Sequence, residues 1–164
     1  SCIRSMLHYG GFVEGWAVYV ENLSYGYAAQ LTKSEETAAY IEACRLNRNL
    51  HLCLYSYMDI AIHYDGATPD QIGRFLENLG LGRHANAETI YEYLVEEPCN
   101  YLKYYLGYLE FLSLKQKAEE LWGTDYSDYR FHKFVLETGP SDFRSLDELI
   151  TLHSYHSQNF GNQS

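Results

Sequence analysis

Apolar residues recur at helical intervals along nearly the whole chain. The stretch 35–64 contains no glycine and no proline, so it predicts one long helix. Glu35 and Glu36 suit the first turn of that helix, where the macrodipole favours negative charge, and Thr32 with Glu35 predicts a capping box. No stretch alternates between apolar and polar residues as a half-buried strand does. The pattern therefore predicts an all-α fold.

Caps and breakers delimit the other predicted helices. Thr68 with Gln71 predicts a second capping box, and Pro69 between them suits the first helical position. A further helix should begin at Pro98, since proline favours a first turn, and should end before Gly123. The remaining predicted boundaries are the caps Asn86, Ser127 or Asp128, and Ser141, the stops near Gly80 and Gly139-Pro140, and a final helix end at about Tyr155.

These boundaries predict a single multi-helix domain of about six or seven helices over residues 1–156, followed by a polar tail over 157–164. The composition is that of a folded chain, because 46% of the 164 residues are hydrophobic and a chain of this length can bury a sizeable core. The formal net charge of -10 argues against a surface for nucleic-acid phosphates or anionic lipids. No apolar run is long enough to predict a transmembrane helix.

The first candidate for chemistry is Glu14, which lies within an otherwise apolar helical stretch near the N-terminus. Glu21 follows seven residues later, on the same helix face. A carboxylate on an apolar face needs a base, a hydrogen-bond donor or a metal ion as its partner. Glu14 is therefore either a structural acid paired with an arginine or a functional carboxylate.

The second candidate is a polar stripe, formed by His51, Tyr55, Asp59 and His63 at intervals of four residues in the long helix. A mostly buried helix with one such stripe lines a cleft or carries a hydrogen-bond network. Asp59 and His63 stand one turn apart and can touch. An acid beside an imidazole fixes its tautomer and favours its charged form, which suits a proton donor or an oxyanion stabiliser. The alternative is a satisfied interior pair.

The third feature is a band of tyrosines at helical spacing, formed by Tyr101, Tyr104, Tyr105 and Tyr108. Such a band is more often core than site, although a phenol that faces a cleft can stabilise an oxyanion. His132 is interpreted either as a histidine at the edge of the core or as a site residue. The sequence contains no His-Glu-x-x-His, no G-x-S-x-G and no phosphate-binding loop to complete a catalytic set.

Four segments together resemble the motifs of a bacterial family called domain of unknown function 885. The motifs are E-G-W-A-x-Y-x-E, D-x-G-x-H, P-x5-Y-x2-G and F-H-x3-L-x2-G, and their order and spacing agree with this chain across about residues 12–150. Ala61 stands where the second motif has glycine. The family is similar to mostly helical zinc metallopeptidases whose third zinc ligand is a glutamate. The matching segments are Glu14 to Glu21, Asp59 to His63, Pro98 through Tyr104 to Gly107, and Phe131-His132 with Leu136 and Gly139.

The resemblance implies a set of site residues. Glu14 would be the third zinc ligand, and His63 and Tyr104 would be catalytic residues that bind the substrate carbonyl or its oxyanion. Asp59 would orient His63. The resemblance also implies that the chain is the C-terminal portion of a zinc-dependent peptidase, inactive without an upstream His-Glu-x-x-His segment. Asp59 and Glu21 would support the residues that bind metal and substrate, and Tyr101 and His132 would bind substrate.

Partners and cofactor follow from the same resemblance. The chain begins at Ser1 without methionine, so we expect a longer protein, and its compartment is left open. Zinc should bind tightly only in that longer protein, whose N-terminal part and a peptide substrate are the expected partners. Without that part, we expect Phe12, Trp16 and Val18 to be exposed and to promote self-association. The alternative is a non-catalytic helical module that binds or scaffolds another molecule.

Overall fold

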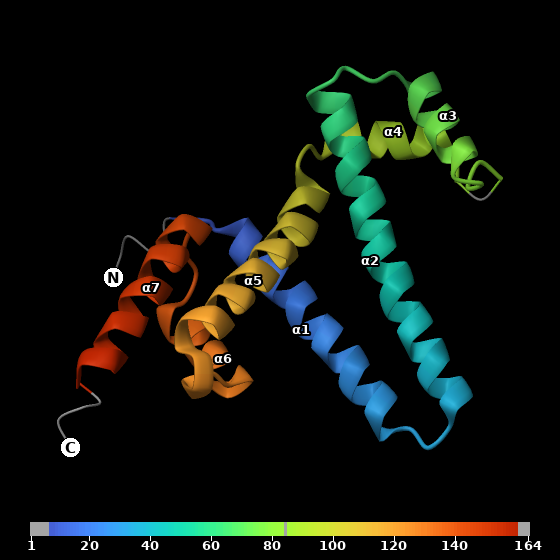
Figure 1. Ribbon diagram of the computed structural model, residues 1–164. Helices are drawn as coiled ribbons and strands as arrows, with labels where there is room; N and C mark the ends of the chain where they lie inside the picture. Colours follow the sequence, from blue (N-terminus) through green and yellow to red (C-terminus); the bar gives the residue numbers. More distant parts are fainter. Residues whose placement is uncertain (1–6, 84, 161–164) are drawn as a thin grey trace. The chain divides into compact units, whose positions relative to one another are not determined.

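Helices account for the fold, as the sequence pattern predicted. The computed structural model describes residues 7–83 and 85–160, and side chains up to residue 152. Across these residues one 3-10 turn and seven α-helices form, and no strand is present. The helices are α1 (Gly10–Leu31), α2 (Glu35–His63), α3 (Pro69–Asn78), α4 (Ala87–Glu96), α5 (Asn100–Trp122), α6 (Asp128–Thr138) and α7 (Phe143–Phe160) (Figure 1).

Several predicted boundaries are confirmed by the hydrogen bonds at helix ends. The Thr68 hydroxyl accepts from the Gln71 N–H at 3.4 Å, and the Gln71 side chain accepts from the Thr68 N–H at 2.8 Å, which completes the capping box of α3. Asn86 caps α4 and Ser127 caps α6. Local sequence signals therefore suffice for these ends.

Two predicted helix starts are wrong. Ser34, and not Thr32, is the N-cap of α2: its hydroxyl accepts from the Thr37 N–H, while the Thr32 hydroxyl accepts from the Ser34 N–H at 3.2 Å. The helix expected from Pro98 begins at Asn100, because Cys99 takes a left-handed φ of 63° that no α-helix contains.

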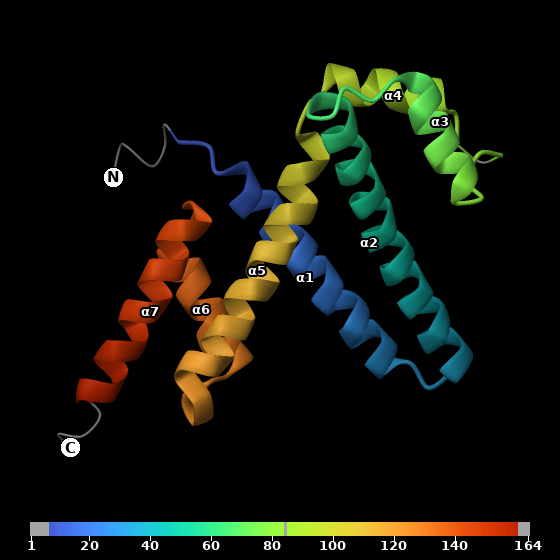
Figure 2. The same cartoon turned by 45° about the horizontal axis from the view of Figure 1, so that its top comes forward.

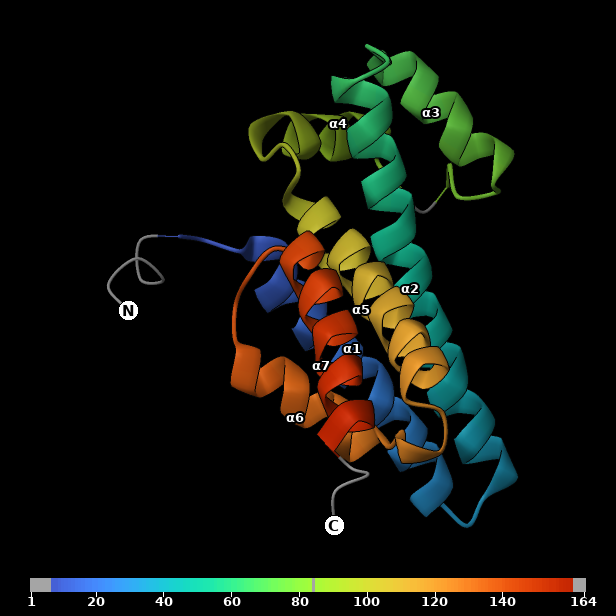
Figure 3. The same ribbon diagram turned by 60° about the vertical axis from the view of Figure 1, so that its left-hand side comes forward.

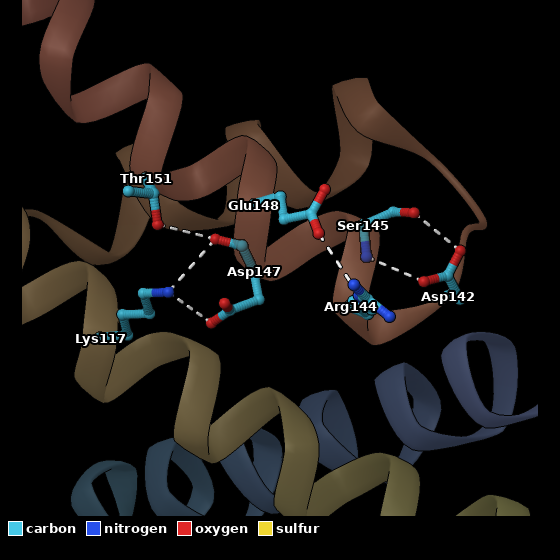
Figure 4. A network of polar contacts seen from close by, with 7 residues as sticks. All are labelled: Lys117, Asp142, Arg144, Ser145, Asp147, Glu148 and Thr151. Carbon is cyan, nitrogen blue, oxygen red and sulfur yellow. Dashed lines mark hydrogen bonds and ion pairs between the residues drawn. The ribbon is translucent and has the colours of Figure 1, made fainter.

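The last helix also differs from the prediction. Asp142, and not Ser141, caps α7 by accepting from the Ser145 N–H at 2.8 Å (Figure 4). The helix ends at Phe160 instead of near Tyr155. Residues 161–164 of the predicted tail lie outside the described residues, and the predicted division at residue 156 stays a prediction.

The chain divides into two compact units. Unit 1 comprises residues 1–20 and 106–164, and unit 2 comprises residues 21–105. The helices α1 and α5 therefore each contribute one part to each unit. In the part of the chain that the structure describes, no helix combines the length and the apolarity needed to cross a membrane.

In unit 1, α1 and α5 meet through two glycines. A Cβ atom added to Gly15 would stand 2.5 Å from the Cα atom of Gly107, and one added to Gly107 would stand 2.9 Å from the Cα atom of Gly15. Real Cβ atoms essentially never approach a neighbour within 3.0 Å. The two backbones are therefore in direct contact, and only glycine fits at either position.

Aromatic side chains build the core of unit 1 next to this contact. Phe111 on α5 packs edge-on against Phe12 at a ring-centroid distance of 5.3 Å and against Phe143 at 5.1 Å. The helices α6 and α7 lie beside the second half of α5 (Figure 3). Lys117 on α5 donates to the Asp147 carboxylate on α7 at 2.6 Å, an exposed pair that contributes little to stability (Figure 4).

In unit 2, α3 and α4 pack against the C-terminal part of α2 (Figures 1 and 2). Near the middle of α2, the side-chain amides of Asn22 and Asn49 exchange hydrogen bonds of 3.1 and 2.7 Å. These bonds join the second part of α1 to α2. The apolar core where the three helices meet is formed by Met58, Ile62, Ile72, Leu76 and Leu94.

Gly15→Ala should destabilise the fold by roughly 1–3 kcal/mol, because the added methyl group meets backbone atoms that cannot rotate away. Gly26→Ala on the same helix is the matched control, since nothing lies within 4 Å of its Cβ position. It should leave stability unchanged or raise it by up to about 1 kcal/mol. Denaturant unfolding measures both variants, and equal stabilities would contradict the direct backbone contact.

Candidate functional site

Glu14 lies on α1, one residue before the glycine that contacts α5, and its side chain is half-buried. Among the residues that the structure describes, none forms a hydrogen bond or an ion pair with Glu14. No arginine of the described chain pairs with Glu14, so the interpretation of Glu14 as a structural acid paired with an arginine has no support there. Glu14 is held on a rigid backbone and its carboxylate has no protein partner there.

The apolar neighbours of Glu14 are covered, contrary to the expectation that they would be exposed. Phe12 is 5% exposed and Val18 is 2% exposed. Trp16 is partly buried, and its ring packs against Phe111 with centroids 5.2 Å apart. The prediction of an open apolar face around these three residues is wrong, because α5 and α6 supply aromatic partners within unit 1.

His132 on α6 contacts α1, the helix that carries Glu14, through a hydrogen bond and a ring contact. Its Nε2 atom lies 2.9 Å from the hydroxyl of Tyr19, and its ring packs edge-on against Trp16 at 5.7 Å. Burial is the main cause that lowers the pKa of His132; Asp128 opposes this effect and Lys115 reinforces it. The neutral imidazole is therefore favoured. Tyr19 was missed as a site residue, although its place in E-G-W-A-x-Y-x-E was a signal for it.

In unit 2, Asp59 and His63 lie together on α2. Asp59 is 1% exposed, and neither of its carboxylate oxygens has a hydrogen-bond partner in the described chain. His63 is one-third exposed, and its Nε2 atom lies 3.7 Å from Asp59 Oδ1, which is beyond hydrogen-bond distance. The same Nε2 atom lies 3.0 Å from the backbone oxygen of Leu94 on α4. The histidine is therefore oriented mainly by a backbone carbonyl group, and not by Asp59 as expected.

The rest of the polar stripe joins a cluster of aromatic rings. Tyr55 stacks on His51 with centroids 4.3 Å apart and packs against Tyr101 at 4.5 Å. Burial, followed by the neighbouring Tyr93 phenol, raises the pKa of Tyr101 to about 12, so this phenol stays neutral. A pocket of about 360 Å³ adjoins the cluster, and its lining of mostly apolar residues includes His51, Tyr55, Leu81 and Ile90.

The last two predicted site residues also have neighbours in unit 2. Glu21 pairs with Arg48 on α2 at 3.4 Å, so the structural interpretation weighed for Glu14 describes Glu21 instead. Tyr104 is half-buried on α5, and the ammonium group of Lys103 lies 5.7 Å from the centre of its ring. A partly exposed ion pair such as Glu21–Arg48 contributes modestly to stability.

The structure does not bring all predicted site residues into one unit. Glu14 and His132 belong to unit 1, whereas Glu21, Asp59, His63, Tyr101 and Tyr104 belong to unit 2. The expected convergence of Glu14, His63 and Tyr104 therefore stays a prediction. Within the described residues, no three His, Cys, Asp or Glu side chains are grouped closely enough to hold a metal ion.

The sequence matches the family described as "bacterial protein of unknown function (DUF885)" over residues 1–150. This match covers most of the chain, so the protein belongs to that family. Comparisons with curated proteins and with solved structures gave no match.

The lowered pKa of the half-buried His132 predicts that the protein becomes less stable as the pH falls. The pKa of an unfolded histidine is about 6.5. Because the folded pKa lies lower, the contribution of His132 is complete above about pH 6.5 and is lost as the pH falls from that value through the folded pKa. His132→Gln should therefore reduce the drop in Tm between about pH 7.5 and 5.5.

His8→Gln is the control for this measurement, since His8 is exposed. Thermal unfolding followed by circular dichroism at several pH values gives the slope for each variant. The same pH dependence in His132→Gln and in the unsubstituted protein would show that His132 is not held neutral by the fold.

Proposed function

We propose that this chain supplies the third zinc ligand and the substrate-binding groups of a zinc-dependent peptidase. The observation that carries the proposal is Glu14, a half-buried carboxylate without a partner in the described chain. An unpaired acid among apolar side chains is costly, so a cation at this position would have a physical reason. The motif around Glu14 supports this role, because it resembles the E-G-W-A-x-Y-x-E of a family that is similar to zinc metallopeptidases with a glutamate ligand.

A single carboxylate is one part of a zinc site. Catalytic zinc takes three protein ligands and keeps a fourth position open for water. We therefore assign the other two ligands to a His-Glu-x-x-His segment outside these 164 residues, which contain no such sequence. Bound zinc would lower the pKa of a water molecule and so supply the nucleophile for peptide hydrolysis.

Other residues of the chain would bind the substrate. The phenol of Tyr104 is a hydrogen-bond donor of the kind that stabilises the oxyanion of a tetrahedral intermediate. His63 would contact the same carbonyl region, with Asp59 and the Leu94 carbonyl setting the orientation of its ring. Tyr101, kept neutral, would contribute apolar contact and a hydroxyl group.

A non-catalytic helical module is the second candidate, and specific contacts favour it. The Nε2 atoms of His63 and His132 are both engaged in intramolecular hydrogen bonds, and Glu21 is paired with Arg48. Three of the predicted site residues thus have structural partners. This alternative gives no role to Glu14, whose carboxylate has no partner in the described chain.

Peptide hydrolysis by the product of the complete reading frame tests the proposal. We expect zinc-dependent turnover there and none from the 164-residue chain alone. Glu14→Gln should reduce turnover by more than roughly 10- to 100-fold, which is the loss expected when a residue that only hydrogen-bonds to a metal ligand is changed. Glu110→Gln, which changes an exposed acid on α5, is the matched control.

Two results would refute the peptidase. The first is a complete reading frame that lacks a His-Glu-x-x-His segment, which would favour the non-catalytic module. The second is full activity in a folded Glu14→Gln variant, since the proposed metal ligand would then be dispensable.

A further inference from the structure

The last turn of α4 contains a backbone carbonyl without its ordinary donor. In an α-helix, the carbonyl of residue i accepts from the N–H of residue i+4. The carbonyl of Tyr93 does so, since the Glu97 N–H lies 3.1 Å away. For Leu94 the corresponding residue is Pro98, which has no N–H, and Glu97 before the proline has already left the helical conformation with φ -126° and ψ 70°. Leu94 is fully buried, so water is poorly placed to replace the missing donor.

His63 takes the place of that donor. Its Nε2 atom lies 3.0 Å from the Leu94 oxygen. A carbonyl oxygen only accepts hydrogen bonds, so Nε2 must carry the hydrogen atom. The imidazole also lies at the C-terminal end of α4, where the helix macrodipole favours a donor or a positive charge.

Asp59 reinforces this arrangement from the same helix. Its Oδ1 atom lies 3.7 Å from His63 Nε2, and both of its oxygens lack other hydrogen-bond partners in the described chain. The hydrogen on Nε2 therefore bonds to the Leu94 oxygen, and the Asp59 carboxylate adds a nearby negative charge without a hydrogen bond. No hydrogen bond to Nδ1 is found among the described residues, and the side chain is one-third exposed.

We propose that Pro98 is a positioning residue that determines which ring nitrogen of His63 is available to a ligand. By lacking an N–H, Pro98 leaves the Leu94 carbonyl to His63, which commits Nε2–H to the fold and leaves Nδ1 available to a ligand. Neutral His63 then presents a lone pair at Nδ1 and accepts a hydrogen bond or a proton. It donates to an oxyanion only when it is doubly protonated.

The two parts of this inference rest on different grounds. The contact of Nδ1 with a peptide substrate rests on the proposed function. The tautomer and its dependence on Pro98 rest on the contacts within unit 2 alone. Failure of the peptidase proposal would leave the tautomer unaffected, so the two are tested separately.

The test is ¹⁵N NMR of the 164-residue chain with labelled histidine, recorded above the ordinary histidine pKa of about 6.5. His63→Gln assigns the signals. We expect Nε2 of His63 to carry a slowly exchanging hydrogen and Nδ1 to give the shift of an unprotonated ring nitrogen. A hydrogen on Nδ1 in the unsubstituted protein would overturn the proposal.

Pro98→Ala supplies an N–H and removes the restriction that the proline ring places on Glu97, so α4 can continue by one residue and donate to the Leu94 carbonyl. Exchange of the His63 Nε2 hydrogen should then accelerate roughly fivefold or more, the factor that corresponds to one ordinary hydrogen bond. Pro140→Ala, which lies beyond α6 in unit 1, is the matched control and should leave that exchange unchanged.

Pro98→Gly introduces the same N–H with less constraint on the backbone, and it replaces Pro98→Ala if that variant does not fold. Unchanged exchange and unchanged nitrogen shifts of His63 in a folded Pro98 variant would show that the proline has no positioning role.

Discussion

The direct contact between Gly15 and Gly107 is the constraint on which the candidate metal ligand depends. Because neither position has space for a Cβ atom, the backbones of α1 and α5 are in direct contact at these two glycines. Glu14 precedes Gly15 on the same rigid turn, and Tyr19 reaches His132 from the next turn of α1. The first family motif is thereby joined to the glycine of the third and to the histidine of the fourth.

Partnered and unpartnered polar groups separate the structural residues from the candidate functional ones. Glu21 has Arg48, and His63 has the Leu94 carbonyl that Pro98 leaves free. Asp59 and Glu14 have no hydrogen-bond partner in the part of the chain that the structure describes. Asp59 is closed off from solvent beside a histidine, whereas Glu14 keeps part of its surface open. That difference suits an orienting role for Asp59 and a ligand role for Glu14.

Local signals predicted more of the fold than of the site. The capping box of α3 was predictable because Thr68 and Gln71 are three residues apart, but the bond between Tyr19 and His132 joins residues 113 positions apart. Periodicity carries no information about such a bond. The covering of Phe12 likewise depends on α5, which no local pattern reveals. The bond from His63 to Leu94 had a signal, since Pro98 stands at the position of the missing donor.

The most direct test of the account is the position of zinc in a crystal of the complete reading-frame product, located by anomalous scattering at the zinc absorption edge. The account predicts an ion with a Glu14 carboxylate oxygen at about 2.0–2.2 Å, together with two histidines from outside these 164 residues. Zinc bound without Glu14, or a Glu14 carboxylate paired with an arginine, would contradict it.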